Sequence, residues 1–452
     1  MSGMKKVVDY LVVGGGTGGL SSAREAAKAG ATVALVEGRK IGGTCTNVGC
    51  IPKKLTWYAG NLIHDLKAAS DFGLNCSYEF AYQTLKKNRD ALTENIDQNY
   101  QEKLCREGVE FIRGSASFVD KNTVCVEGAG LISASHILIA TGARSMLPPV
   151  DGYEHLLTSD DFFRLEHLPQ EVLIIGNGYI ACELAGMFNS FGVDTTMAIM
   201  ESNFLEGFDQ SLAGILKECY EENGVKLYFE KTSTEVRKEN SKLAVSFNDG
   251  TELSSQMVFA AVGRKANFQK LGIDKVHLEL DDFGALKVDE FQNTSVEGIY
   301  ALGDVTSNPQ LTPVAKQAGK KLAYRLFGSE PQAKVDLSFV PTVVFSHPPL
   351  GSVGLTEDKA LDKYGESMKV YHTRFTDLYH MMSSTKQPSL VKIIADGKTP
   401  DSNVVGLHAV GKGVDEMMQG FSVAVSKNLT VRELKNSISI HPTSAEEFLA
   451  SV

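Results

Sequence analysis

The sequence has few cysteines and prolines for its length and no long apolar run. Seven cysteines in 452 residues are too sparse for a secreted disulfide scaffold, and the odd number leaves at least one unpaired thiol if all pairing is intramolecular. Thirteen prolines against 42 glycines exclude proline-rich disorder. No segment reaches the roughly 18 continuous apolar residues of a membrane span. We therefore expect a globular protein of a reducing compartment, the cytoplasm, without a membrane partner.

Positive charge is also in deficit. Lysine and arginine number 45 against 55 acidic residues, a formal net charge of −10, so phosphate backbones and anionic lipids meet no general attraction. Nucleic acid is therefore a poor default partner. The first residues run straight into the apolar stretch 7–13, so we expect no cleaved signal. At roughly 150 residues per domain, the length predicts about three domains.

A glycine-rich turn follows this first apolar stretch. The motif G-x-G-x-x-G at 14–19 leads from the expected strand 7–13 into apolar residues at helical spacing. In this context the glycines permit a tight turn, the approach of a pyrophosphate and close helix packing. A second strand, 31–37, ends in Glu37, where a carboxylate can accept hydrogen bonds from an adenosine ribose. The pattern predicts a dinucleotide site, against the alternative that the glycines serve packing alone.

The same pattern recurs later in the chain. A strand at 172–175 precedes G-x-G-x-x-A at 176–181, and we expect a helix from Cys182 onward and a further strand at 195–200. Alanine is a tolerated third residue of this motif. Two such modules predict two dinucleotides, most naturally a flavin and a nicotinamide that exchange hydride.

Other segments complete this organisation. The strand 136–140 leads into Thr141-Gly142 and could close the first module. The strand at 298–303 ends in Gly303-Asp304, where a carboxylate could bond a ribityl hydroxyl, although Gly-Asp alone is more often an ordinary turn. Beyond residue 338, strand-like runs alternate with helical segments and carry no glycine fingerprint, which predicts a dimerisation or substrate domain. These runs are 339–345, 391–394 and 404–408.

Cys45 and Cys50 form a C-x4-C pair after the first module. In an undistorted helix five residues rise about 7.5 Å, beyond the usual Cα separation of a disulfide, so the pair requires a bend, which Gly49 makes plausible. A cysteine at a helix start near lysines has its thiolate favoured, so we favour a redox-active disulfide. Two structural thiols or half a metal site are the alternatives. No metal site is predicted, because the other cysteines are scattered singly.

Residues 42–54, GGTCTNVGCIPKK, closely resemble the signature of the pyridine-nucleotide disulfide oxidoreductases, and the resemblance covers essentially the whole chain. The stretches 50–54, 343–349 and 441–447 are most similar to members that reduce glutathione disulfide. The resemblance implies FAD, NAD(P)H and a homodimer whose active site is shared between subunits. The fold it implies is α/β, with two Rossmann-like dinucleotide-binding domains and a C-terminal α+β dimerisation domain. The expected domains are FAD-binding 1–142, NAD(P)-binding 143–266, central 267–337 completing the FAD site, and interface 338–452.

The resemblance also assigns roles to residues. Cys45 attacks the disulfide substrate, Cys50 is the thiolate beside the flavin, and His441, fixed by Glu446, protonates the leaving thiol. Lys53 and Glu183 form an ion pair, and Tyr179 covers the nicotinamide pocket. The expected flavin contacts are Gly14, Gly16, Thr17, Gly18, Gly19, Glu37, Thr44, Lys53, Ala116, Thr141, Gly142, Asp304 and Thr312. The expected nicotinamide contacts are Gly176, Gly178, Tyr179, Ile180, Glu183, Glu201, Gly263 and Arg264.

The substrate positions depart from the family pattern. Thr17, Arg24 and Tyr100 match glutathione-contacting positions, but Lys316 and Lys320 replace an apolar residue and an arginine. Positive charge is kept, while bidentate carboxylate recognition is lost. Members that reduce the cationic trypanothione disulfide carry an acid and a tryptophan at 21 and 24, so glutathione disulfide is favoured here.

The coenzyme positions depart as well. Family members that use NADPH place two arginines where this chain has Met200 and Glu206, and Glu201 would repel a 2′-phosphate. These residues favour NADH, whereas the family favours NADPH, which Arg264 or Lys265 could then bind. Two further functional alternatives stay open: reduction of another small disulfide, such as a modified glutathione or lipoamide, and a flavoprotein redox sensor without turnover.

Overall fold

The computed structural model describes residues 6–452, which divide into two compact units. The first unit holds the chain up to Lys53, Lys86–Met146 and Arg264–Leu337. The second holds Lys54–Leu85, Leu147–Gly263 and Ser338–Val452. The expectation about a leader concerns residues that lie partly outside the described range, and the expected domain limits stay predictions.

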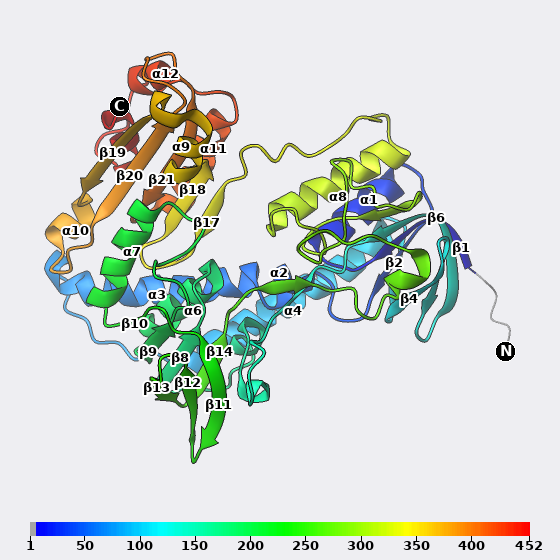
Figure 1. Ribbon diagram of the computed structural model, residues 1–452, viewed down its shortest axis with the longest axis horizontal. Helices are drawn as coiled ribbons and strands as arrows, with labels where there is room; N and C mark the ends of the chain where they lie inside the picture. Colours follow the sequence, from blue (N-terminus) through cyan, green and yellow to red (C-terminus); the bar gives the residue numbers. More distant parts are fainter. Residues whose placement is uncertain (1–5) are drawn as a thin grey trace. The chain divides into compact units, whose positions relative to one another are not determined.

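A seven-stranded sheet forms the centre of the first unit (Figure 1). Its order is β3-β2-β1-β6-β5-β4, and β16 pairs with β6. The strands β3, β2, β1, β6 and β16 are parallel, whereas β4 and β5 join antiparallel. The expected strand 7–13 is confirmed as β1, whereas 136–140 falls at the end of the longer β6 and 298–303 contains the shorter β16. The seven strands are β1 (Lys6–Val13), β2 (Val33–Glu37), β3 (Val109–Arg113), β4 (Ala116–Asp120), β5 (Thr123–Val126), β6 (Gly130–Ile139) and β16 (Ile299–Ala301).

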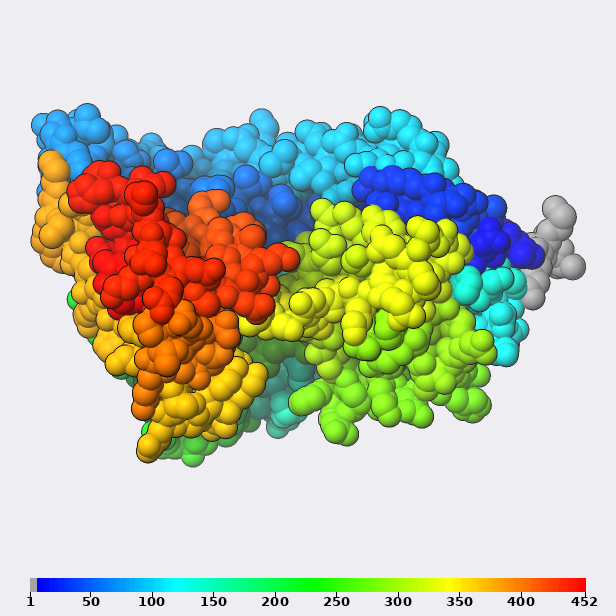
Figure 2. Space-filling model, turned by 90° about the horizontal axis from the view of Figure 1, so that it is seen from above, coloured from blue at the N-terminus to red at the C-terminus, as the bar shows by residue number. Residues whose placement is uncertain are grey.

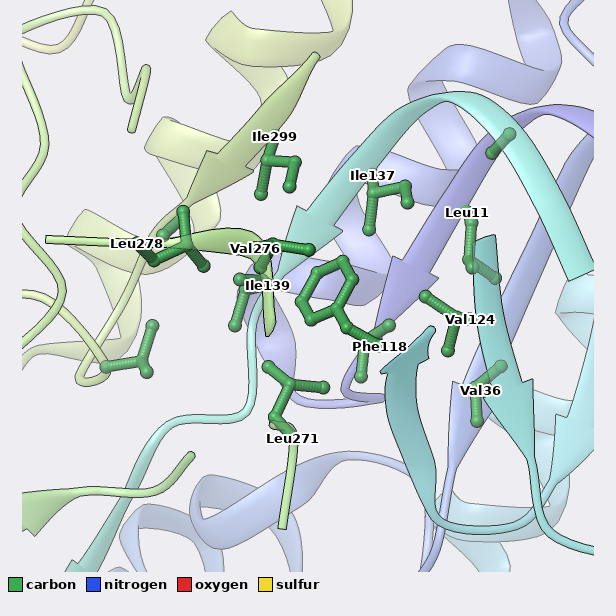
Figure 3. Packing of buried hydrophobic residues seen from close by; sticks show 14 of the residues in the cluster. Leu11, Val36, Phe118, Val124, Ile137, Ile139, Leu271, Val276, Leu278 and Ile299 are labelled. Atoms are coloured by element: carbon green, nitrogen blue, oxygen red, sulfur yellow. The ribbon is translucent and has the colours of Figure 1, made fainter. Parts of the chain in front are cut away.

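Both faces of this sheet are buried. Along β1 the side chains alternate, so that Leu11 enters one apolar cluster and Tyr10 the other. Figure 3 shows the first cluster, in which Phe118 packs among residues of β6 and of the segment around Val276. The helices α1 (Thr17–Lys28) and α8 (Thr312–Phe327) cover the second cluster. Burial on both faces explains the continuous apolar runs of these strands in the sequence.

The helices α1 and α8 touch through their backbones. A Cβ on Gly319 would lie 2.3 Å from the Gly18 carbonyl oxygen, and a Cβ on Gly18 would lie 3.1 Å from that of Ala315. Only glycine at these two positions allows so close an approach. The packing holds the N-terminal residues Thr17 and Thr312 at the same end of the helix pair.

The second unit contains three sheets. The parallel sheet, of order β10-β9-β8-β14, is formed by β8 (Glu171–Ile175), β9 (Asp194–Ala198), β10 (Lys226–Tyr228) and β14 (Met257–Ala260). The three-stranded antiparallel sheet is formed by β11 (Ser233–Glu239), β12 (Lys242–Phe247) and β13 (Glu252–Ser255). The C-terminal antiparallel sheet, of order β17-β18-β21-β20-β19, is formed by β17 (Thr342–Val344), β18 (Leu350–Gly354), β19 (Lys369–Phe375), β20 (Ser389–Ala395) and β21 (Val404–Val410).

Two expected boundaries are wrong in this unit. Helix α6 (Tyr179–Ser190) begins three residues before Cys182, because Gly178 already takes the extended N-cap conformation. Strand β9 ends at Ala198, so Glu201 lies in the loop beyond the strand rather than at its end.

None of the helices in residues 6–452 has the length and apolar character needed to cross a bilayer. The remaining helices and strands are α4 (Tyr82–Arg106), α5 (Ser159–Phe162), α7 (Gln210–Glu222), α9 (Glu357–Tyr364), α10 (Leu378–Met382), α11 (Val414–Val425), α12 (Val431–Asn436), α13 (Glu447–Ala450), β7 (Ala143–Ser145) and β15 (Arg264–Ala266).

Candidate active site

The cysteine pair lies where one helix gives way to the next. Cys45 belongs to the short α2 (Gly43–Asn47), and Cys50 is the first residue of the long α3 (Cys50–Ala68). A Cβ on Gly49 would lie 2.8 Å from the Thr44 carbonyl oxygen, so glycine lets the chain close at this break. The bend expected from the C-x4-C spacing is confirmed.

The two thiols are free in this structure and share a hydrogen bond. That bond from Cys45 lowers the pKa of Cys50, and the Thr312 hydroxyl and the Lys53 charge lower it further against the effect of burial. The same hydrogen bond, together with burial, raises the pKa of Cys45. A thiolate at Cys50 is also favoured by its place at a helix N-terminus. The pair is therefore polarised, with Cys50 as the sulfur that carries the charge.

The first glycine module has the shape of a phosphate cradle. Gly14 takes φ +115°, and a Cβ there would lie 2.3 Å from the Ala140 carbonyl oxygen, so the turn requires glycine. Beside Gly16, in contrast, the nearest atom to a Cβ would be 3.9 Å away, which leaves room above the start of α1. The Glu37 carboxylate is fixed at the end of β2 by the amides of Gly15 (2.8 Å) and Arg39 (2.6 Å). This arrangement fits the adenosine diphosphate part of FAD.

Burial affects two polar groups of the same unit, the Thr141 hydroxyl and the Asp304 carboxylate. Thr141 Oγ1 is buried with no hydrogen-bond partner among residues 6–452. Burial raises the pKa of Asp304, against the opposing charge of Arg264. A hydroxyl and a carboxylate in this state fit a ligand that brings hydroxyls and ring nitrogens, as FAD does. Of the other expected flavin contacts, Thr44 lies in α2 and Ala116 opens β4, while Gly142 accepts from the Asn267 amide.

The second module repeats the cradle. Gly176 takes φ +141° against the Ala261 carbonyl oxygen, and a Cβ on Gly178 would meet no atom within 4 Å. The side chain between these glycines, Asn177, donates to the Asn203 carbonyl oxygen (2.9 Å) and accepts from the Leu205 amide (2.7 Å). Asn177 thus ties the cradle to the loop after β9, an arrangement that the sequence pattern did not reveal.

The loop after β9 also holds the residues expected to choose the coenzyme. Glu201 Oε2 is buried without a hydrogen-bond partner among the described residues. Met200 and Glu206 are exposed. A buried carboxylate oxygen without a donor fits a ligand hydroxyl and disfavours a phosphate.

The helix α6 presents the other expected nicotinamide contacts. Tyr179 and Ile180 form its first turn, and the Glu183 carboxylate accepts from the Phe345 amide (2.9 Å). Lys53 and Glu183 belong to different units, so their ion pair stays a prediction. Gly263, with φ +119°, ends the second unit's middle segment.

Arg264 belongs to the first unit. It lies on β15, which pairs with β7, and its guanidinium donates to the Ala143 carbonyl oxygen (2.7 Å) and to Ser145 Oγ (3.3 Å). Its expected nicotinamide contact stays a prediction.

His441 and Glu446 come together at the C-terminus. The ring atom Nδ1 lies 3.0 Å from Glu446 Oε2, and this hydrogen bond lowers the pKa of Glu446. The segment before His441 is apolar and exposed, with Ile438 98% and Ile440 76% exposed. Because His441 and the cysteine pair lie in different units, their meeting stays a prediction.

The expected substrate residues lie on α1, α4 and α8. Arg24 forms an ion pair with Glu107, a residue that no motif singled out, and Tyr100 lies on α4. Lys316 and Lys320 lie one turn apart on α8. In residues 6–452 no group of three or more histidine, cysteine, aspartate or glutamate side chains could hold a metal ion.

Comparison with known proteins identifies the family. The sequence model of the pyridine nucleotide-disulphide oxidoreductases matches residues 8–319, and that of their dimerisation domain matches residues 340–452. The chain is a pyridine nucleotide-disulphide oxidoreductase. This oxidoreductase is also similar to the glutathione reductase of Schizosaccharomyces pombe, with 40% identity over the whole of both chains. Membership of the pyridine nucleotide-disulphide oxidoreductases confirms the expected fold class and implies FAD and NAD(P)H as cofactors and a homodimer.

Proposed function

We propose that this chain reduces glutathione disulfide with electrons from NAD(P)H. The observation that carries the proposal is the 40% identity to a glutathione reductase over both full lengths. The polarised thiol pair on α2 and α3 supports it, because a lowered Cys50 pKa suits a dithiol that turns over. Lipoamide, other small disulfides and a sensor role are not favoured by this similarity.

In this proposal each step of disulfide reduction has its own residue. Bound FAD and nicotinamide supply the hydride chemistry that reduces the Cys45–Cys50 disulfide to a dithiol. Cys45 attacks one sulfur of glutathione disulfide, and a mixed disulfide forms as the first glutathione thiolate leaves. His441, held by Glu446, gives a proton to that thiolate. The Cys50 thiolate then attacks Cys45, which releases the second glutathione and restores the protein disulfide.

Steady-state turnover tests the proposal. Glutathione disulfide should be reduced at least about tenfold more efficiently, by kcat/KM, than lipoamide, a discrimination of about 1.4 kcal/mol. Anaerobic reduction should give a long-wavelength absorbance that Cys50→Ser abolishes. Reduction by NAD(P)H without any disulfide turnover would instead support the sensor.

We infer that NADH is the preferred coenzyme. Glu201 Oε2 is buried and has no donor among residues 6–452, so a free ribose hydroxyl would satisfy it, whereas a 2′-phosphate would be repelled. Met200 offers that phosphate no charge. Family membership alone leaves the choice between NADH and NADPH open.

Side-by-side kinetics with NADH and NADPH test this inference. The wild type should prefer NADH, and Glu201→Gln should weaken the preference while leaving the KM for glutathione disulfide unchanged. Glu230→Gln is the matched control, because Glu230 contacts the same loop only through its amide to the Glu201 carbonyl oxygen (3.2 Å). A preference of the wild type for NADPH by tenfold or more would refute the proposed role of Glu201 in selecting NADH.

We further propose that each active site is shared between two subunits. His441 lies on a segment whose isoleucines are exposed, as expected for residues that a partner covers. In a shared site the cysteine pair of one subunit meets His441 and Glu446 of the other. Hybrid dimers of Cys50→Ser and His441→Ala chains then contain one complete site and should recover up to about half of the wild-type activity. If each subunit were complete alone, these hybrids would stay inactive.

We propose the cytoplasm as the compartment. The small number of cysteines supports this, since seven in 452 residues are too few for a secreted disulfide scaffold. Cell fractionation followed by immunodetection tests the assignment.

A further inference from the structure

The arginine expected to meet the substrate is already engaged. Arg24 donates from Nε and from Nη2 (2.8 Å) to the two carboxylate oxygens of Glu107. Both side chains are only 20% exposed, so water competes weakly for them. This paired geometry is the one a substrate carboxylate would need at the guanidinium, and Glu107 occupies it.

Further charged groups surround the pair of Arg24 and Glu107. Glu25 also acts on Arg24, and its carboxylate binds Lys28 Nζ (3.0 Å). Lys28 and Lys103 in turn act on Glu107. Arg24 therefore faces two carboxylates, one of which holds it by a double hydrogen bond.

The helix α8 carries the uncompensated charge. Lys316 and Lys320 make no ion pair with any residue in 6–452. They follow Thr312 by one and two turns, at about 6 and 12 Å along the helix, on the same face. Thr312 in turn contacts the Cys50 sulfur. Figure 2 shows the surface of α8, in yellow, beside that of α1, in blue.

We propose that Glu107 determines substrate specificity by holding Arg24, which moves recognition of the substrate carboxylates from α1 to Lys316 and Lys320. This inference rests on the proposed reduction of glutathione disulfide. A lysine ammonium attracts a carboxylate as a point charge and does not fix its plane. The substrate class is therefore acidic disulfides in general. It includes glutathione derivatives whose carboxylates lie at other positions than in glutathione itself.

Steady-state kinetics with glutathione disulfide distinguish the contribution of α1 to substrate binding from that of α8. In Lys316→Ala/Lys320→Ala the KM should rise about tenfold, while Arg24→Ala should change it less than about twofold. Glu107→Gln should lower the KM by about two- to fivefold, and adding Arg24→Ala should cancel that gain. The kcat and the reduction by NADH should stay unchanged, which also reports that the variants fold. The KM of the wild type should rise with ionic strength.

Glu25→Gln is the matched control, because it removes one negative charge near Arg24 without touching the double hydrogen bond, and its KM should not change. A KM for Arg24→Ala as high as that of the double-lysine variant would overturn the inference, as would an unchanged KM in Glu107→Gln. A wild type that accepts electrons from NADH but does not reduce glutathione disulfide would overturn the proposed function and this inference with it.

Discussion

The hydroxyl oxygen of Thr312 lies 3.3 Å from the thiol sulfur of Cys50. Thr312 is the first residue of α8, and Cys50 is the first residue of α3. Two helix N-termini therefore converge on one sulfur, and each favours negative charge there. The hydrogen bond from Cys45 is the largest cause of the lowered pKa of Cys50, and the Thr312 hydroxyl and the Lys53 charge lower it further against the effect of burial.

Removing the Thr312 hydroxyl should raise the Cys50 pKa. In reduced Thr312→Val we expect the thiolate to titrate about half a unit to one unit higher, because a hydrogen bond to the charged form is lost. The rate of alkylation against pH measures this shift. Thr17→Val is the matched control, because Thr17 hydrogen-bonds Cys45 instead, and the Cys50 titration should then stay in place. Equal shifts in both variants would show that the pair titrates as one unit.

Loss of His441 should affect one half-reaction only. His441→Ala should slow reoxidation by glutathione disulfide by roughly 10²- to 10⁴-fold, the range for loss of a general acid, and leave reduction by NAD(P)H unchanged. Stopped-flow absorbance measures the two steps separately. His155→Gln, a change at a histidine that makes only a 3.8 Å contact with Glu154, should alter neither step. An equal slowing of both steps would contradict the assigned role.

Asn177→Ala should impair coenzyme binding without affecting the disulfide substrate. The variant loses two hydrogen bonds, one buried and one partly buried, to the loop that carries Glu201, so we expect a several-fold higher KM for NAD(P)H and a loss of about 1–3 kcal/mol in stability. Asn189→Ala is the control, since Asn189 makes one bond from the far end of α6, to the Asn223 carbonyl oxygen (3.0 Å). A raised KM for glutathione disulfide in Asn177→Ala would mean that the change reaches beyond the loop.

The ion pair between Lys392 and Asp209 should control acid stability. It lies buried in the second unit, with Nζ 2.8 Å from Oδ1 and side-chain exposures of 3% and 2%. Burial alone would raise the pKa of Asp209, but the hydrogen bonds from Lys392 and the Glu357 amide hold it below its ordinary value. The pair therefore stabilises the fold above the unfolded pKa of about 4, and the contribution is lost as the pH falls through the lowered folded pKa.

Lys392→Met should consequently lower the free energy of unfolding at neutral pH by about 3–5 kcal/mol, since Asp209 stays buried without its cation. Urea unfolding at several pH values measures the effect. The double variant Lys392→Met/Asp209→Leu should recover most of the loss. A double variant as unstable as the single one would assign the loss to packing rather than to charge.

The sequence alone predicted most of the fold, because local patterns determine it. The glycine motifs and the apolar strands before them identify both modules, and the structure confirms the strands at 7–13 and 172–175. The helix start at Tyr179 was missed because the helix begins inside the glycine motif itself, directly after Gly178. The C-x4-C spacing predicted a bend, but it could not predict that Thr312, far along the chain, would reach Cys50.

The side-chain contacts within the site were harder to predict from the sequence. Glu107 and Asn177 belong to no motif, and their importance arises from contacts with residues distant in sequence. Arg24 shows the limit most clearly, since its position suggests a substrate ligand while its partner, Glu107, occupies the same donors. Residue type and spacing carry no information on such competition.

The exposed Ile438 and Ile440 also affect the assembly of newly synthesised chains. In the shared site proposed above, a second copy covers these apolar side chains, so a newly synthesised chain carries them exposed to water. Exposed apolar side chains favour association with other chains. Expression level and dilution should therefore govern the yield of usable protein, independently of how well each chain folds by itself.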